Sequence, residues 1–297
     1  MRGTAKTKLL GLFANPADHS KSPSIFNHAF DKYNLDYTYL SFNIPEGKIE
    51  EAISAMRVLG MKGANISMPH KTAVIPYLDE VSSEALFCNA VNTVSNDGGV
   101  LKGYNTDIYG AVKAIECMGA SIRGSKVAVL GAGGAGKAVL YGLSENNPAQ
   151  IKLFIRGKDA FDLGKLDESH HTREVLEYAE RLIDKTGCKI DIFDVESETS
   201  LIRELADIDI LINATGIGMG KTEGESLINS PECFSNKPYV LDVIYSPEKT
   251  EFLRLAEASG CKISNGLNML AYQAEKAYNI MVGSNLEIDD IMEAIGK

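Results

Sequence analysis

A glycine-rich run near the middle of the chain restricts the fold more than any other feature. The six residues from Gly131 to Gly136 have the spacing G-x-G-x-x-G, and they lie between the apolar segment 127–130 and a helical pattern. Between a strand and a helix, such glycines permit a tight turn and let a pyrophosphate approach the backbone. The amides and the positive end of the helix dipole then face the phosphates. The run predicts a dinucleotide site at Gly131, Ala132, Gly133, Gly134 and Ala135, with a purely structural glycine turn as the alternative.

Strand-like and helix-like segments alternate along the whole chain, which predicts an α/β fold with parallel β-α-β crossovers. In the second half, strands are expected at 127–130, 151–156, 188–195, 209–215, 239–245 and 261–264. These are enough for a Rossmann-type doubly wound sheet. In the first third, strands are expected at 8–15, 37–44, 63–68, 90–94 and 100–106, with helices at 22–34, at 46–59 and after Pro69. The double glycine at 98–99 indicates a hairpin between the last two strands.

The chain of 297 residues is about twice as long as a typical single domain. We expect one α/β domain over residues 1–108 and a Rossmann domain over 109–267. Apolar residues recur at helical spacing after Gly266 and again near the end of the chain. These C-terminal helices, in 268–297, are expected to return to the first domain.

The formal net charge of −10 argues against nucleic acid and anionic membranes as partners. An anionic small molecule would therefore have to be held by local hydrogen-bond donors. No apolar stretch has the length of a membrane helix or of a secretory signal. The five cysteines are scattered and contain no C-x-x-C pair, which favours a reducing cytoplasm and argues against a disulfide framework or a metal site. The sequence does not decide whether the protein forms a homodimer.

The end of the second Rossmann strand bears on cofactor choice. NADP sites place a basic side chain there for the 2′-phosphate, whereas NAD sites place an acidic one. Arg156 and Lys158 favour NADP, and Asp159 leaves NAD open. Solvated loop charges are the alternative reading of Lys158 and Asp159.

Several blocks of sequence resemble the shikimate dehydrogenase family. They are SKSP (20–23), GANIS with MPHK (63–71), AVNT (90–93), NTD (105–107), GAGGAGKA (131–138), INAT (212–215) and NGLNMLAYQA (265–274). They follow the order and spacing of the family's blocks over about residues 11–283, and parts of the chain are more similar to its quinate/shikimate dehydrogenase branch. The resemblance makes 1–108 with 268–297 the substrate-binding and catalytic domain and 109–267 the dinucleotide-binding domain.

The resemblance implies that Lys71 and Asp107 form a catalytic pair. A lysine beside a carboxylate can relay the proton of a secondary alcohol, while the nicotinamide takes the hydride. Without the resemblance, Lys71 reads as a surface lysine in the first turn of a helix, and Asp107 reads as a helix N-cap.

Other site residues follow from the same resemblance. Ser20 and Ser22 would bind the substrate carboxylate, although Ser22-Pro23 also has the pattern of an N-cap followed by N1. The ring hydroxyls and the rest of the substrate pocket are assigned to Asn65, Asn92, Asp107, Gln273, Ser67, Tyr39 and Thr106. Tyr245 and Gly266 would lie near the substrate and the nicotinamide, and Ala214 and Thr215 beside the dinucleotide. Gln273 could instead be a solvated helix residue, and Tyr245 a core residue.

The sequence departs from the family's pattern at three positions. His70 stands where the family has Phe and is given no role, and Ser67 replaces Thr but keeps the hydroxyl. Ile155 stands where NADP-dependent members have Asn, so the choice between NADP and NAD stays open.

The resemblance implies an NAD(P)-dependent oxidoreductase, reducing 3-dehydroshikimate to shikimate with NADPH in aromatic amino acid biosynthesis. A dual-specificity quinate/shikimate dehydrogenase is the first alternative. A folate-linked methylene dehydrogenase would lack the SKSP and NTD blocks. A catalytically idle binding or sensor protein on the same scaffold is the alternative from another class.

Overall fold

The computed structural model describes residues 3–18, 20–157 and 170–296. The chain forms two compact units, one made of Met1–Gly110 with Ala271–Lys297 and the other of Ala111–Leu270. The division falls inside helices α4 (Asp107–Cys117) and α10 (Leu267–Val282). The boundaries predicted from the sequence lie within a few residues of this division, and the roles assigned to the two parts stay predictions.

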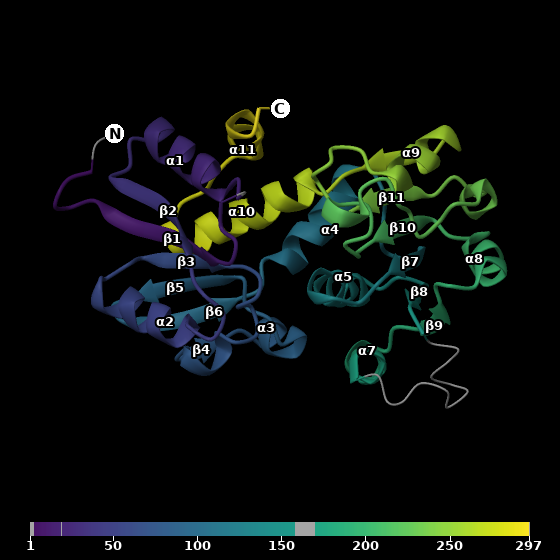
Figure 1. Cartoon of the computed structure of the whole chain (residues 1–297), viewed down its shortest axis with the longest axis horizontal. Coiled ribbons are helices and arrows are strands. Elements are labelled where there is room, and N and C mark those ends of the chain that lie inside the picture. Colours follow the sequence, from purple (N-terminus) through teal and green to yellow (C-terminus); the bar gives the residue numbers. More distant parts are fainter. Residues whose placement is uncertain (1–2, 19, 158–169, 297) are drawn as a thin grey trace. The chain divides into compact units, whose positions relative to one another are not determined.

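The first unit is built on a mixed sheet of six strands in the order β2-β1-β3-β5-β6-β4 (Figure 1). Strands β1, β2 and β3 are parallel, whereas β5 runs antiparallel to both β3 and β6. The hairpin turn between β5 and β6 contains Gly98 and Gly99, both with positive φ, as the sequence predicted. The strands are β1 (Lys8–Ala14), β2 (Tyr37–Asn43), β3 (Gly63–Ile66), β4 (Glu80–Val81), β5 (Thr93–Asp97) and β6 (Val100–Tyr104).

Helices cover both faces of this sheet because its strands bury side chains on both faces. In β1, Leu10 and Leu12 pack with one cluster, which includes residues of α1, α10 and α11, and Phe13 packs with another, which includes residues of α2. The helices of this unit are α1 (Ser22–Lys32), α2 (Ile49–Val58), α3 (Ser83–Cys88), α11 (Ile288–Ala294) and parts of α4 and α10.

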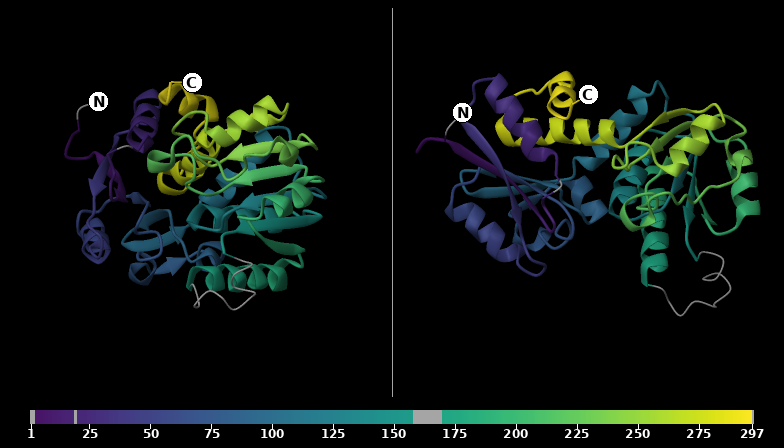
Figure 2. Two further views of the ribbon diagram at one scale, coloured as in Figure 1. Left: turned by 45° about the vertical axis from the view of Figure 1, so that its right-hand side comes forward. Right: turned by 45° about the horizontal axis from the view of Figure 1, so that its top comes forward.

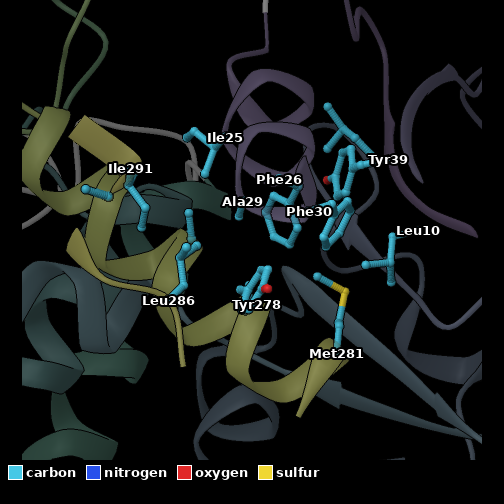
Figure 3. Packing of buried hydrophobic residues seen from close by; sticks show 14 of the residues in the cluster. Leu10, Ile25, Phe26, Ala29, Phe30, Tyr39, Tyr278, Met281, Leu286 and Ile291 are labelled. Carbon is cyan, nitrogen blue, oxygen red and sulfur yellow. The ribbon is translucent and has the colours of Figure 1, made fainter. Parts of the chain in front are cut away.

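The C-terminal helices belong to the first unit, as predicted. Figure 3 shows Phe26 and Phe30 of α1 beside Tyr278 of α10, with Tyr39 of β2 on the other side of Phe26. The ring centroids of Phe26 and Tyr39 are 4.5 Å apart, and those of Phe26 and Tyr278 are 5.8 Å apart. Leu286 and Ile291 from the last residues of the chain complete this cluster.

The prediction of a helix directly after Pro69 is wrong. Residues 71–74 form a turn that leads into a short 3-10 helix, η1 (Ile75–Tyr77). Strand β4 and helix α3 follow, and Ser82 caps α3 by accepting a hydrogen bond from the amide of Ala85. The turn leaves Lys71 on irregular backbone, where its carbonyl accepts a 2.8 Å hydrogen bond from the amide of Val91.

The second unit is a doubly wound Rossmann sheet, which confirms the predicted fold class. Its six strands are all parallel in the order β12-β11-β10-β7-β8-β9, so the strand order reverses between β7 and β10. Ligands of such sheets bind beyond the carboxyl ends of the strands at this point. The strands are β7 (Lys126–Leu130), β8 (Gln150–Ile155), β9 (Ile190–Asp194), β10 (Ile210–Asn213), β11 (Tyr239–Asp242) and β12 (Lys262–Ser264).

Helices lie on both faces of this second sheet (Figure 1 and Figure 2). Side chains of α8 and α9 share one core cluster with Ala128 and Leu130 of β7, while α5 packs beside α7. The helices are α5 (Gly134–Ser144), α7 (His170–Thr186), α8 (Glu198–Leu205), α9 (Glu251–Ala258), η2 (Gly220–Thr222), η3 (Pro231–Phe234) and the remainder of α4 and α10. No helix in the described ranges is both long and apolar enough to cross a bilayer.

Candidate active site

Lys71 and Asp107 form an ion pair in the first unit. The Nζ atom of Lys71 lies 2.6 Å from Oδ2 of Asp107, and the two side chains are 25% and 13% exposed. Asp107 is the first residue of α4, and the carbonyl of Thr106 accepts the hydrogen bond from the amide of Gly110 that begins the helix. Thr106 therefore occupies the cap position, and reading Asp107 as an N-cap is wrong.

Asn92 fixes the other oxygen of the same carboxylate. Its Nδ2 donates to Oδ1 of Asp107 over 2.8 Å. The amide oxygen of Asn92 accepts from the backbone amide of Thr106 at 2.8 Å and from its hydroxyl at 3.1 Å. The orientation of the amide is thereby determined, and the Asp107 carboxylate has one oxygen on Asn92 and the other on Lys71.

A second chain of hydrogen bonds reaches this pair from the neighbouring strands. The hydroxyl of Tyr39 donates to Oδ1 of Asn65 at 2.9 Å, and Nδ2 of Asn65 donates to the Thr93 hydroxyl at 3.2 Å. The Thr93 hydroxyl in turn donates to Oδ1 of Asn92 at 3.1 Å. Tyr39, Asn65 and Thr93 are buried. Polar side chains at the ends of β3 and β5 thus form one continuous network with the ion pair.

Ser20 and Ser22 lie at the start of α1. Helix α1 begins at Ser22 with Lys21 in the cap position and no side-chain capping bond, so reading Ser22 as the N-cap is wrong. The Ser20 hydroxyl accepts a hydrogen bond from the amide of Ser22 at 3.2 Å. Burial raises the pKa of Tyr39 well above its usual range, and a hydrogen bond from the Ser22 side chain opposes this rise. Ser22 therefore joins the network at its Tyr39 end, and Ser20 lies beside it.

Gln273 connects the C-terminal helix to the same network. Oε1 of Gln273 lies 3.4 Å from the Thr106 hydroxyl, as a second acceptor for the proton that Asn92 also accepts, so Gln273 is more than a solvated residue of α10. Ser67 follows β3 and is half-buried, and its amide donates to the carbonyl of Phe13 at 3.0 Å. The described hydrogen bonds thus join the predicted site residues of the first unit in one network, except Ser20, which bonds the backbone amide of Ser22, and Ser67, which is held through its own backbone amide.

Three residues near the site were not assigned by the sequence analysis. Thr93 is fully buried and joins Asn65 to Asn92. Asn105 donates to the carbonyl of Ala90 at 3.0 Å and accepts from the amide of Asp107 at 3.2 Å. His70 is buried, with its Nε2 2.8 Å from the carbonyl oxygen of Ile44, which can only accept. Thr93 and Asn105 belong to the AVNT and NTD blocks, and this position in the family's blocks could have identified them as site residues.

The glycine-rich loop of the second unit joins β7 to α5. Gly131 has φ +86°, and a Cβ atom there would overlap the Cγ2 methyl of Thr215. A Cβ at Gly136 would overlap the carbonyl oxygen of Gly131. Gly133 and Gly134 are exposed and have open space around them, and α5 begins at Gly134. Amides in the first turn of a helix lack intrahelical partners, so this loop fits the phosphates of a dinucleotide.

Ala132 and Ala135 complete the loop, the first buried and the second half-buried. Arg156 follows β8 directly, and its Nε lies 3.4 Å from Oε1 of Glu196 with both side chains largely exposed. Arg156 and Glu196 line a pocket of about 370 Å³. Lys158 and Asp159 lie outside the described residues.

The remaining predicted cofactor residues follow β10, β11 and β12. Ala214 is buried, and the amide and hydroxyl of Thr215 both donate to Oδ1 of Asn213. Burial raises the pKa of Tyr245. A Cβ atom at Gly266 would overlap the carbonyl oxygen of Val243, so only glycine fits there. Ala214, Thr215, Tyr245 and Gly266 all lie in the second unit, and their contacts with ligands stay predictions.

Comparisons with known proteins agree with these observations. The family model of the shikimate dehydrogenase substrate binding domain matches residues 12–94. A shikimate dehydrogenase (NADP(+)) of Listeria monocytogenes is 37% identical over 99% of this chain and 97% of the relative. The solved structure of shikimate 5-dehydrogenase from Listeria monocytogenes, in complex with shikimate and NAD, is 38% identical with a TM-score of 0.90 over 99% of this chain and 98% of that one. Quinate dehydrogenase from Corynebacterium glutamicum, in complex with NAD, is 27% identical with a TM-score of 0.83 over 97% and 98% of the two chains. The chain therefore belongs to the shikimate dehydrogenase family of NAD(P)-dependent oxidoreductases.

Proposed function

We propose that this protein catalyses the reversible reduction of 3-dehydroshikimate to shikimate with NADP(H), a step of aromatic amino acid biosynthesis. The observation that carries the proposal is the 2.6 Å contact between Lys71 Nζ and Asp107 Oδ2, in a network of the residues that the family blocks contain. The resemblance to a shikimate dehydrogenase (NADP(+)) over nearly the whole chain supports the substrate and the cofactor.

The substrate is a ring acid with several hydroxyl groups. The hydroxyls of Ser20 and Ser22 bind its carboxylate, and they supply the local donors that a chain of net charge −10 needs for an anion. Asn65, Asn92, Asp107 and Gln273 bind the ring hydroxyls, with Tyr39, Ser67, Thr106 and Tyr245 around them. Because Asn92 already holds Asp107, the substrate meets a carboxylate whose direction is fixed.

Lys71 carries the proton of the reaction. In the reducing direction its ammonium group donates a proton to the carbonyl oxygen, and in the oxidising direction its amine accepts the proton of the alcohol. The Asp107 carboxylate, 2.6 Å away, fixes the direction of Nζ. When bound, the nicotinamide supplies or accepts the hydride.

The second unit holds the cofactor. Gly131, Ala132, Gly133, Gly134 and Ala135 bind the pyrophosphate, and Arg156 binds the 2′-phosphate of NADP. Ala214 and Thr215 lie beside the dinucleotide, and Gly266 beside the nicotinamide. The open surface over Gly133 and Gly134 supports the first assignment.

The test is the absorbance of reduced nicotinamide with purified protein, measured for shikimate and for quinate, each with NADP and with NAD. The proposal requires turnover of shikimate with NADP as the most efficient pair. Turnover of neither substrate with either cofactor would contradict it and leave a binding protein on the same scaffold as the better account.

A dual-specificity quinate/shikimate dehydrogenase is the second candidate. The contact between Arg156 and Glu196 favours it, because a carboxylate beside the guanidinium weakens selection for the 2′-phosphate. The similarity to a quinate dehydrogenase in complex with NAD also supports it. Comparable catalytic efficiency with quinate, or with NAD, in the same assay would replace the first proposal by this one.

We also propose that the protein works in a reducing cytoplasm. All five cysteines are free thiols, and four of them are buried. Loss of activity on removal of reductant, restored by adding it back, would support a reducing compartment, and full activity after oxidation of the thiols would remove this support. Light scattering distinguishes a monomer from the homodimer that the sequence leaves open.

A further inference from the structure

The second unit contains a buried carboxylate that the proposed chemistry does not use. Asp242 is the last residue of β11 and has no exposed surface. Its Oδ1 accepts from Nδ2 of Asn213 and from the amide of Ile244, each at 3.0 Å, and its Oδ2 accepts from the Thr250 hydroxyl at 2.6 Å. Burial raises the pKa of Asp242 to about 6, against the effect of these hydrogen bonds. Burying a carboxylate costs free energy because the charge loses its hydration. A carboxylate this deeply buried is therefore expected to have a structural or functional role.

Asp242 determines how the amide of Asn213 is oriented. Because Nδ2 of Asn213 donates to Asp242, its Oδ1 faces the other way and accepts from Thr215. The amide of Thr215 donates to this oxygen at 3.1 Å and the hydroxyl at 2.7 Å. The Thr215 hydroxyl also accepts from the amide of Ile217 at 3.2 Å. Thr215 is therefore held in one rotamer from two sides.

The methyl group of Thr215 touches the glycine-rich loop. It occupies the space that a Cβ atom at Gly131 would need, so the methyl lies against the α-carbon of Gly131. The amide of Gly131 donates to the carbonyl of Phe154 at 2.8 Å, which holds the other side of this turn. A change in the rotamer of Thr215 would therefore shift the backbone of the turn that follows β7.

Asp242 also acts on the far end of the segment after β10. Its partner Thr250 places Cβ and Cγ2 3.3 Å from the position that a Cβ of Gly218 would take. Gly218 has φ +110°, a conformation that favours glycine. One carboxylate thus supports both ends of the segment 214–218.

We propose that Asp242 is a positioning residue for dinucleotide binding, acting through Asn213 and Thr215 on the loop that begins at Gly131. The inference rests on the proposed function only in taking this loop as the phosphate site. Asp242 itself does not touch the cofactor.

The test compares Asp242→Ala with Asp242→Asn in the full chain. The alanine variant leaves Nδ2 of Asn213 with only its longer, 3.4 Å bond to the carbonyl of Ile217, and we expect the Kd for NADPH, measured by NADPH fluorescence, to rise about tenfold. The KM for NADP should rise in parallel, while kcat and the KM for shikimate change less than about twofold. The asparagine variant can keep an oxygen toward Asn213 and Ile244 and donate to Thr250, so it should recover most of the affinity.

Lys152→Met is the control for lost stability. Lys152 is buried in β8 and bonds the carbonyl of Glu204 and the carboxylate of Asp207, away from the glycine-rich loop. The Lys152→Met variant should have a lower melting temperature than the wild type and an unchanged Kd for NADPH. Should Asp242→Ala fail to fold, Asn213→Ser breaks the link at its centre and leaves the bonds of Asp242 to Ile244 and Thr250 in place.

Two outcomes overturn the inference: an unchanged Kd in Asp242→Ala, or a loss of affinity that Lys152→Met reproduces at equal loss of stability. A different result would show that the proposed function is wrong. A wild-type protein that binds NADPH but does not oxidise shikimate would refute the substrate assignment and leave the role of Asp242 standing.

Discussion

Asp107 binds a different partner with each of its carboxylate oxygens. Asn92 holds Oδ1 at 2.8 Å and Lys71 holds Oδ2 at 2.6 Å. A carboxylate fixed in this way can orient the lysine without moving during the reaction, which is the condition for a preorganised site. In the proposed mechanism, Asn92 positions the Asp107 carboxylate, Asp107 orients Lys71, and Lys71 transfers the proton.

Replacing Lys71 by Ala should lower kcat by about a hundredfold or more and change the KM for shikimate little, because the proton transfer is lost from the transition state. The measurement is steady-state kinetics with shikimate and NADP. Lys102→Ala is the matched control, since Lys102 pairs with Glu80 in the same unit, 3.1 Å apart, outside the network. A normal kcat with a raised KM for Lys71→Ala would show that the lysine only binds substrate.

Replacing Glu196 by Gln should increase the preference for NADP over NAD. The substitution removes the carboxylate 3.4 Å from Arg156 and releases the guanidinium for a 2′-phosphate. Because both side chains are exposed, we expect the ratio of kcat/KM values for the two cofactors to change only about two- to fivefold. Glu198→Gln removes the same charge from the same pocket and should leave the ratio unchanged. Equal ratios in Glu196→Gln and wild type would refute the competition.

At the scale of elements, the turn between β7 and α5 depends on Gly131. Alanine there would combine a positive φ with a clash against Thr215, so Gly131→Ala should destabilise the protein by about 1–3 kcal/mol and weaken NADPH binding. Thermal and denaturant unfolding measure the first effect. Gly47→Ala separates the causes, because Gly47 also has a positive φ, +78°, but open space around it. Equal losses in both variants would mean that the contact with Thr215 contributes nothing.

The Rossmann unit could be predicted from sequence because its signals are local. Apolar runs mark the buried parallel strands, and the glycines mark the turn after the first of them. The hairpin at Gly98 and Gly99 was predicted for the same reason. The prediction of a helix after Pro69 was wrong because the carbonyl of Lys71 accepts from the distant amide of Val91, while the amide of Ile75, its partner in an α-helix, bonds Thr72 instead.

The site was predicted in part. Residues at strand ends, such as Asn92 and Asp107, stand in recognisable blocks, and the structure joins them. Glu196 and Asp242 gave no signal, because each matters through a partner far away in the sequence, Arg156 and Asn213 respectively. Hydrogen bonds between strands that are neighbours only in space cannot be read from a single sequence.

For the whole molecule, Asp242 makes stability depend on pH. Its folded pKa of about 6 lies above the ordinary value of 3.8, so the folded state binds the proton more tightly than the unfolded state. The cost of the buried charge is therefore greatest above pH 6 and disappears as the pH falls toward 4. The free energy of unfolding of Asp242→Asn should therefore rise relative to that of the wild type as the pH increases from about 4 to about 7, by up to about 3 kcal/mol in total. A difference independent of pH would mean that Asp242 titrates normally.

The packing of α10 and α11 against α1 has a consequence for synthesis on the ribosome. Phe26, Phe30 and Tyr39 leave the ribosome early, yet their partners Tyr278 and Ile291 come from the last residues of the chain. The second unit, by contrast, is a single continuous stretch and can fold before translation ends. Phe26 and Phe30 can therefore complete their packing only after α10 and α11 have emerged, and until then they expose apolar surface that a chaperone could cover.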